Sequence, residues 1–333
     1  MQRGFFLPRR KLYRATLPDD GHTSFLWPFS QAFAATLDLA ELPAIAERLR
    51  PDVADRLDGL AHYWNGHGHP PAYDSAARSW FSAPSDQFTD DNAWVGLQLV
   101  RAHELTGEAA ALDRARDILR FLIDNWDDDP SHPDPGGVFW VRAGWCRDRN
   151  TVSTAPAAIL ALRLHALAGD ADALSWATRM YDWVRQALLA PNGLYWDHVD
   201  LAGTVERTQW SYNQGTMVGA GVLLAGATGD DAYREQAART ARAALAFYAE
   251  GDRLAGQEPA FNAIFLEHLL LLRASGVDLD LTLLRGYGEW LWESARDPGS
   301  GLVVLAPDRP IDLLQQAAAS RICALLARSS GSR

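Results

Sequence analysis

Two adjacent carboxylates, Asp90 and Asp91, follow Phe88 and Thr89 at the start of an apolar segment. The segment 92–105 has the dense apolar spacing of a helix that is buried on most faces. Thr89 or Asp90 is predicted to cap this helix, because a short oxygen-bearing side chain accepts hydrogen bonds from first-turn amides. An acid there also complements the helix dipole, so a purely structural role for the pair remains an alternative.

Adjacent carboxyl groups at the entrance of a buried helix are suited to cleavage of a glycosidic bond. Retaining cleavage needs one carboxyl as acid and a second as nucleophile, about 5–5.5 Å apart. The helix N-terminus favours one aspartate as carboxylate, and that charge raises the pKa of its neighbour, which stays protonated. The pair therefore predicts an acid and a nucleophile, although two adjacent aspartates alone are not a specific signal.

The composition is globular and acidic. Of the 333 residues, 48% are hydrophobic and 22% charged, which is enough for a large core. With 31 basic and 42 acidic residues the formal net charge is −11, which argues against nucleic acid as a partner. The two cysteines, Cys146 and Cys323, are far apart in sequence and are expected to be buried free thiols.

Membrane and export signals are weak in this sequence. No stretch approaches 18 uninterrupted apolar residues, so no transmembrane helix and no membrane partner are expected. The N-terminus has no apolar run followed by small residues and does not resemble a signal peptide. For the sequence as it stands, we expect a cytoplasmic monomer.

Helix signals dominate the chain and recur in pairs. Glycines end predicted helices at intervals of roughly 50 to 60 residues, at Gly107, Gly169, Gly229 and Gly276. The helix before such a glycine is rich in Ala, Leu and Gly, as in 153–168, 211–227 and 260–274. The helix after it has one apolar stripe and a charged face, as in 112–126, 171–189, 231–250 and 279–295. The first kind is predicted to be enclosed and the second to cover it.

Six enclosed helices are expected, beginning near Ser30, Asn92, Ser153, Ser211, Ala260 and Ile311. This pattern predicts an all-α protein in which residues 1–333 form a single (α/α)6 barrel of six inner and about six outer helices. A superhelical stack of the same hairpins is the alternative, but neither end has a polar capping repeat. Pro51 is expected to kink or split the outer segment 43–62.

Long loops lead into the inner helices, at 65–90, 127–152 and 191–210. Because inner helices share a direction, these loops are expected to meet at one mouth, where function usually collects. They carry many aromatic and acidic side chains, which suit the C–H faces and the hydroxyls of a sugar. Trp64 and Trp140 are therefore predicted to bind substrate, with packing in the core as the alternative for each tryptophan.

The stretch TDDNAWVGLQLVRAHELTGE resembles the signature of glycoside hydrolase family 76, the α-1,6-mannanases. The similarity covers roughly 60–290 in the family's order, with WDDD…PGGVFW, RNTVST, LYWDH, WSYNQGTMVGAGVLLAGATGD and FNAIF. It implies an (α/α)6 barrel and retaining cleavage of α-1,6-linked mannosides without a metal or other cofactor. Endo action on mannan and exo action on oligosaccharides both remain open.

Carried onto matching positions, the resemblance makes Asp90 the nucleophile and Asp91 the general acid/base. Asp197 would hold sugar hydroxyls. Four further residues would line or brace the cleft, with packing and capping at helix starts as the alternative: Trp94, Tyr212, Asn213 and Gln214.

The chain departs from the family pattern at Pro135, Thr154 and Asn262-Ala263, and its segment 26–30 matches poorly. These positions are expected to lie at the rim of the cleft. The departures therefore bear on substrate and chain length more than on the acid pair.

Other signals are weaker. The acidic loop 127–134 with His132 lacks the ligand spacing of a calcium loop, so no metal is predicted. His103 and His165 are expected to be core residues, whereas the remaining candidates for sugar contact are His62, His67, His69 and His198. Two alternatives to hydrolysis are a non-catalytic glycan-binding module and a sugar epimerase on the same barrel, the latter requiring histidine bases deep in the cleft.

Overall fold

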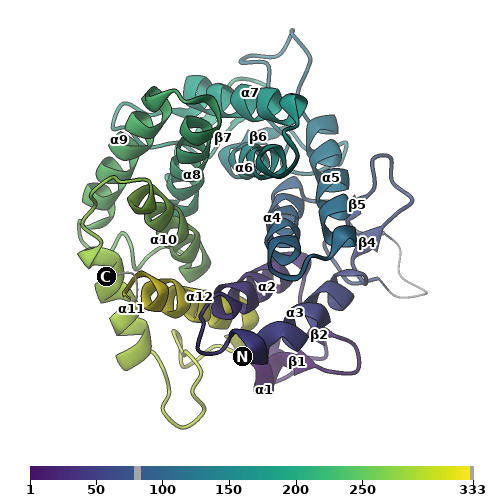
Figure 1. Cartoon of the computed structure of the whole chain (residues 1–333), viewed down its shortest axis with the longest axis vertical. Helices are drawn as coiled ribbons and strands as arrows, with labels where there is room; N and C mark the ends of the chain where they lie inside the picture. The colour runs from purple at the N-terminus through teal and green to yellow at the C-terminus, as the bar shows by residue number, and fades with distance from the viewer. Residues whose placement is uncertain (79–83, 331–333) are drawn as a thin grey trace.

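Twelve helices occur in the computed structural model, which describes residues 1–78 and 84–330 (Figure 1). Six form an inner ring: α2 (Leu26–Ala40), α4 (Thr89–Thr106), α6 (Thr151–Ala168), α8 (Ser211–Thr228), α10 (Pro259–Ala274) and α12 (Leu313–Ser330). Five long helices lie outside it: α3 (Ala46–Leu60), α5 (Ala109–Asp124), α7 (Ala171–Leu188), α9 (Asp231–Tyr248) and α11 (Thr282–Glu293). The four-residue helix α1 (Gln2–Phe5) lies against α3, where Gln2 bonds to Asp52 at 3.0 Å.

The ring is closed, because the last inner helix, α12, packs against the first, α2 (Figure 1). Closure confirms the predicted (α/α)6 barrel and excludes the superhelical stack. Each inner helix is followed by an outer one that runs back along it, except the last. The inner helices therefore share one direction, and all their N-termini meet at one mouth.

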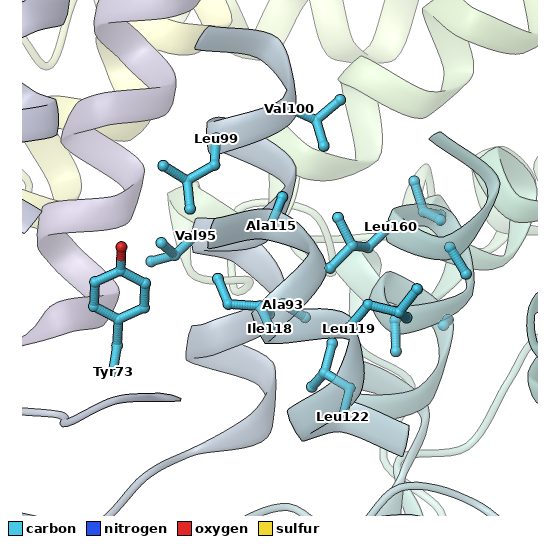
Figure 2. Packing of buried hydrophobic residues seen from close by; sticks show 14 of the residues in the cluster. Tyr73, Ala93, Val95, Leu99, Val100, Ala115, Ile118, Leu119, Leu122 and Leu160 are labelled. Atoms are coloured by element: carbon cyan, nitrogen blue, oxygen red, sulfur yellow. The ribbon is translucent and has the colours of Figure 1, made fainter. Parts of the chain in front are cut away.

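The packing of α4, α5 and α6 shows why the two kinds of helix differ (Figure 2). The apolar stripe of α5, which includes Ala115, Ile118 and Leu122, is buried against its two inner neighbours. Inner helices are in contact on nearly every side, and Gly96 permits the close approach of α4 to α6. A Cβ at Gly96 would lie 2.6 Å from Leu160 Cδ2, so an alanine there would require the Leu160 side chain to move.

Glycine ends three inner helices as predicted. Gly107, Gly169 and Gly229 have φ of 76°, 67° and 74°, a left-handed conformation that favours glycine. His103 and His165 are not core residues, contrary to the prediction. They are half-buried, and each Nδ1 bonds to the carbonyl of the residue that follows the glycine, at 2.9 and 2.8 Å.

Helix starts differ from the prediction at several places. The helix α4 begins at Thr89 rather than Asn92, and α2 begins at Leu26 rather than Ser30. Pro51 neither splits nor ends α3, which runs unbroken through it. Pro51 is the sixth residue of the helix, so it removes one intrahelical hydrogen bond without ending the helix.

Short antiparallel strands connect the loops. Near the N-terminus β1 (Phe6–Leu7) pairs with β2 (Leu12–Tyr13), and β4 (Trp64–Asn65) pairs with β5 (Ala72–Tyr73). β3 (Thr16–Leu17) pairs with β9 (Ile311–Asp312), which joins the two ends of the barrel. A three-stranded sheet of β6 (Asp148–Asn150), β7 (His198–Asp200) and β8 (Val205–Glu206) ties together the loops before α6 and α8.

One described helix, α6, is long and apolar enough to cross a membrane, with a mean hydropathy of 1.3. It belongs to the inner ring, and 72% of it is buried inside the protein, as in the core helix of a globular fold. Both cysteines are free thiols; Cys146 is buried as predicted, whereas Cys323 is only half-buried.

A buried ionic network holds the ring closed. Arg321 of α12 is 1% exposed and bonds to Asp38 at 2.9 Å and to Gln31 at 2.7 Å, both on α2. It also pairs with Glu267 of α10, and Asp38 accepts a further bond from Arg101 of α4 at 2.6 Å. Burial raises the pKa of Glu267, but the two guanidinium groups outweigh this and bring it to about 2.

Replacement of Arg321 by methionine is expected to destabilise the barrel by about 3–5 kcal/mol, because it leaves buried carboxylates without a partner. Unfolding by denaturant at neutral pH measures the effect. The matched control is Arg116→Met on the outer helix α5, which removes an exposed pair with Asp113 and should cost about 0–1 kcal/mol. Equal decreases in the free energy of unfolding of the two variants would show that the network does not stabilise the closed ring.

Candidate active site

A cavity of about 470 Å³ opens at the mouth where the inner helices begin. First-turn residues of five inner helices line it, together with the loops before α4, α6 and α8. The lining residues are Trp27, Phe88, Asp90, Asp91, Trp94, Trp140, Asp148, Asn150, Val152, Asp197, His198, Tyr212 and Phe261. The long loops therefore meet at one mouth, as the sequence predicted.

The first turn of α4 is held by the loop before α6. Thr89 does not cap the helix, contrary to one prediction; its buried hydroxyl lies 2.6 Å from the carbonyl oxygen of Phe139 and 2.9 Å from that of Trp140. The Thr89 amide also donates to the Trp140 carbonyl, at 2.9 Å. These bonds fasten the Trp140 loop to the turn that carries the two aspartates.

Asp90 is held by two donors. Its Oδ1 accepts from the Asp91 amide at 2.9 Å, and its Oδ2 accepts from Trp140 Nε1 at 3.1 Å. Neither bond reaches the amides that a side-chain cap would satisfy, so Asp90 does not cap α4 either. Burial raises the pKa of Asp90 to about 6, the two hydrogen bonds act to lower it, and the charge of Asp197 adds to the rise.

Asp91 is the more strongly perturbed member of the pair. It is buried, and both this burial and the charge of Asp90 raise its pKa well above the ordinary value. Hydrogen-bond donors stabilise the carboxylate of Asp90, whereas burial and the charge of Asp90 both favour the protonated form of Asp91. The surroundings therefore favour a carboxylate at Asp90 and a protonated carboxyl at Asp91.

A second polar cluster lies in the same cavity. Asp197 Oδ2 bonds to His198 Nδ1 at 2.9 Å, and Asp197 Oδ1 accepts from Asn213 Nδ2 at 3.4 Å. His198 Nε2 lies 3.9 Å from Asp148 Oδ1. The hydrogen bond to Asp197 and the charges of both acids raise the pKa of His198, which favours the protonated imidazole.

Aromatic rings form the walls of the cavity. Tyr212 and Phe261 are stacked with centroids 3.9 Å apart and an interplanar angle of 6°. Burial raises the pKa of the Tyr212 phenol, and the charges of Asp197 and Asp90 raise it further. The phenol therefore stays neutral, and its hydroxyl is available for hydrogen bonds with a ligand.

Most of the predicted site residues lie in or beside the cavity, and one lies away from it. Trp94, Trp140, Asp197 and Tyr212 line the cavity together with the two aspartates. Trp64 does not line it; the Trp64 ring packs beneath a guanidinium, with Arg114 Cζ 3.5 Å from its centroid.

Asn213 and Gln214 are fully buried and brace the wall rather than line it. Asn213 holds Asp197, as described above. Gln214 bonds to the backbone of Tyr195 through both ends of its amide, at 2.7 and 2.9 Å. It thereby fixes the path of the loop that carries Asp197 and His198.

Several cavity residues were missed by the sequence reasoning. Phe88 borders the acid pair, and Asn150 and Phe261 belong to the motifs RNTVST and FNAIF, so a signal for them was present. Trp27 had none, because its segment matched the family pattern poorly. It reaches the cavity because α2 begins at Leu26, and it contacts Trp94 with ring centroids 5.8 Å apart.

The acidic loop 127–134 has a structural role. Asp127 accepts from Arg149 at 2.7 Å and lies 2.9 Å from His132 Nδ1, so its carboxylate is already paired. Within residues 1–78 and 84–330, no three His, Cys, Asp or Glu side chains are grouped so as to hold a metal ion.

Comparison of the sequence with known protein families identifies one that matches most of the chain. The profile of Glycosyl hydrolase family 76 matches residues 12–272. Mannan endo-1,6-alpha-mannosidase DCW1 of Candida glabrata is 29% identical over 174 residues, which are 48% of this chain and 38% of the relative. The protein of the same name from Saccharomyces cerevisiae is 28% identical over 177 residues, 49% of this chain and 39% of the relative. The chain thus spans about two fifths of the length of these curated relatives.

Solved structures share the fold. A family 76 glycoside hydrolase from a bovine Bacteroides thetaiotaomicron strain has a TM-score of 0.87 at 23% identity, covering 99% of this chain and 75% of the other. An α-1,6-mannanase from Salegentibacter sp. HEL1_6 has a TM-score of 0.81 at 23% identity, covering 98% and 96%. The latter is an inactive variant, with two consecutive aspartates replaced by asparagine, in complex with α-1,6-mannotriose.

Replacement of Trp140 by phenylalanine is expected to raise the pKa of Asp90 above its value of about 6, because it removes a hydrogen bond that favours the carboxylate. Carbon-13 NMR of labelled aspartate carboxyls measures this, with the titration treated as that of the coupled pair. Trp27→Phe is the matched control, since Trp27 lines the same cavity while the indole bonded to Asp90 is that of Trp140. An unchanged titration in Trp140→Phe would contradict the assigned role of the indole.

Proposed function

The chain belongs to glycosyl hydrolase family 76, and on that premise we propose that it is a retaining glycoside hydrolase that cleaves α-1,6-linked mannosides. One observation carries the proposal: two consecutive aspartates, both with pKa values raised by burial and only Asp90 with hydrogen-bond donors to its carboxylate, lie in an aromatic-walled cavity. The names of the yeast relatives support mannan as substrate, as does the bound mannotriose of the Salegentibacter mannanase. In that mannanase, too, the inactivating changes fall on two consecutive aspartates.

In the first step of the proposed reaction, the Asp90 carboxylate attacks the anomeric carbon of the mannosyl unit. Asp91 gives its proton to the glycosidic oxygen, and the bond between that oxygen and the anomeric carbon breaks. The leaving sugar departs as a neutral alcohol, and an ester joins the remaining mannosyl unit to Asp90. The raised pKa of Asp91 suits it to this role, because the acid must still hold its proton near neutral pH.

In the second step, Asp91 is ionised and acts as a base. It takes a proton from water, the resulting oxygen attacks the anomeric carbon, and the ester to Asp90 breaks. Two inversions at the same carbon leave the product in the α configuration. Asp90 returns to its carboxylate and Asp91 to its acid form, so no metal or other cofactor is required.

The remaining cavity residues are proposed to bind the sugar. The Asp197 carboxylate, oriented by His198 and Asn213, accepts bonds from hydroxyl groups. The neutral hydroxyl of Tyr212 lies near both Asp197 and Asp90 and adds a donor and an acceptor. Sugar epimerisation is less well supported, because His198 is the one histidine among the described residues that line the cavity, and its Nδ1 is already bonded to Asp197.

Incubation with α-1,6-mannooligosaccharides is expected to release mannosides whose α-anomer appears first in proton NMR spectra. Asp90→Asn and Asp91→Asn should each lower the rate by a factor on the order of 10³ or more, because each removes one of the two reacting groups. With an activated aryl mannoside, whose leaving group needs no proton, Asp91→Asn should still form the mannosyl–enzyme ester, detectable by mass spectrometry, whereas Asp90→Asn should not.

The control is Asp113→Asn on the outer face, which should hydrolyse at the wild-type rate. Both active-site variants should be at least as stable as the wild type at neutral pH, because a carboxyl group whose pKa is raised by folding destabilises the folded state at every pH above its ordinary, unfolded-state pKa. Early β-anomer, or substantial turnover by Asp90→Asn, would contradict the proposal. Binding of mannooligosaccharides without hydrolysis by the wild type would instead support a glycan-binding module.

The rate is expected to rise with pH through about 6, as Asp90 loses its proton, and to fall at higher pH as Asp91 loses its own. A profile of kcat/KM on one mannooligosaccharide measures both limbs, over a range from roughly two pH units below the Asp90 value to roughly three above it. A rate that is constant through pH 6 would contradict the assignment of Asp90 as nucleophile.

A further inference from the structure

A second cavity, of about 560 Å³, lies at the end of the barrel opposite the mouth. Residues from the middle and the C-terminal ends of the inner helices line it. Among the described residues, it has no lining residue in common with the cavity that holds Asp90 and Asp91. Its volume is within the range of small-molecule sites, roughly 300–1,000 Å³. The proposed hydrolysis uses none of the residues in this second lining.

Two of the three glutamates that line the second cavity are already paired. Glu41 accepts a hydrogen bond from Arg101 at 2.7 Å. Glu267 pairs with Arg321, which lies behind it in the ring. The third glutamate, Glu104, is exposed, so solvent screens its charge. The carboxylates of this lining therefore leave little negative charge uncompensated inside the cavity.

Arg163 of α6 is a half-buried cation in the same lining, and its guanidinium has no hydrogen bond or ion pair with any of the described residues. The side chain of Arg273 has none either, but it stands in the last turn of α10, where a positive charge complements the helix dipole. Arg163 stands before the last turn of α6, so the dipole does not account for it. Its N–H donors are therefore available to an anion in the cavity.

His268 of α10 supplies a hydrogen-bond acceptor to the same cavity. It is 5% exposed, and its Nδ1 lies 2.9 Å from the carbonyl oxygen of Ile264. Burial lowers the pKa of His268 by more than the charge of Glu267 raises it, which favours the neutral ring. Because a carbonyl oxygen only accepts, the proton of the neutral ring is on Nδ1. Nε2 therefore keeps a lone pair, and it has no hydrogen-bond partner in the described part of the chain.

Arg163 and His268 lie at the inner end of the second cavity, within reach of a single ligand. Both also line an adjoining cavity of only about 30 Å³. Such a volume holds roughly one or two water molecules, so the residues around it surround a common point. The space for the imidazole comes from α8, because a Cβ at Gly219 would overlap the ring. A larger residue at this position would displace His268 from the lining.

We propose that the second cavity is a binding site for a small hydroxy carboxylic acid. The carboxylate accepts from the Arg163 guanidinium, and the hydroxyl donates to His268 Nε2. The apolar part of the acid packs against Ile159, Leu223 and Leu271, which belong to the same lining. A monoanion suits this site better than a phosphate dianion, because three glutamates stand around it. The site lies outside the proposed reaction and does not depend on it.

Isothermal titration calorimetry of the full chain with α-hydroxyisocaproate tests the site. The wild type is expected to bind it with a dissociation constant on the order of 1 mM, as suits a ligand of so few atoms. Isocaproate, which lacks the hydroxyl, should bind about fivefold more weakly, the scale of one neutral hydrogen bond. The uncharged amide of the hydroxy acid should bind at least about tenfold more weakly, because it loses the charge-assisted bond. These comparisons need no variant.

Arg163→Gln is expected to lower the affinity for α-hydroxyisocaproate at least about tenfold. The matched control is Arg273→Gln, which removes another arginine of the same lining and should stay within about threefold of the wild type. Equal losses of affinity in the two variants would overturn the assignment of Arg163, because total charge would then decide binding. Leu223→Trp fills part of the cavity and should abolish binding, with thermal unfolding as the check that the variant is folded.

Three further results would overturn the inference. The first is no binding by the wild type at roughly ten times the expected dissociation constant. The second is wild-type affinity in a folded Leu223→Trp variant, because the acid would then bind elsewhere. The third is tighter binding of inorganic phosphate than of the hydroxy acid, because the site would then not be built for a carboxylate. None of these results touches the proposed hydrolysis, and a wild type that cleaves no mannoside would leave this inference standing.

Discussion

Closure of the inner ring through Arg321 is the interaction on which the rest of the structure depends. One buried guanidinium reaches Asp38 and Gln31 at the start of the barrel and Glu267 on the fifth inner helix. A charge in such a place is tolerable only when its partners are in position, so the contact specifies one arrangement of α2, α10 and α12. With the ring closed, the first turns of the inner helices surround one mouth, and the cavity that we propose as the active site follows from that geometry.

The carboxyl groups at the two ends of the barrel have different neighbours. At the ends of the inner helices a second cavity, of about 560 Å³, is lined by Glu41, Glu104 and Glu267 together with four arginines, Arg101, Arg163, Arg273 and Arg328. At the mouth, the described residues that line the cavity include four aspartates and neither arginine nor lysine. Burial acts at both ends: at Glu267 the neighbouring arginines outweigh it and lower the pKa, whereas at Asp90 and Asp91 it raises the pKa. The carboxyl groups with raised pKa values therefore lie at the end of the barrel where the proposed chemistry needs an acid.

Prediction from sequence succeeded where residues close together in the chain decide the local structure. Glycines after apolar helices marked helix ends because those positions need a left-handed conformation, as at Gly107 and Gly169. It failed where a distant contact decided the outcome. The hydroxyl of Thr89, expected as a cap, turns to the loop around Trp140, and Trp64, expected to bind sugar, packs against Arg114. Trp27 was not predicted as a site residue, because α2 begins earlier than its apolar pattern indicated.

The sequence by itself determined the helical class, the alternation of inner and outer helices, the family and the position of Asp90 and Asp91 at the start of an inner helix, because periodicity and a contiguous motif are local properties. Only the tertiary structure decided which loops meet, which donor holds Asp90 and how the two carboxyl groups divide their protonation. Desolvation and hydrogen bonds between segments decide those features, as in the bond from Trp140 to Asp90 across 50 positions of the chain. Desolvation and such hydrogen bonds depend on distances in space, which cannot be read from spacing along the sequence.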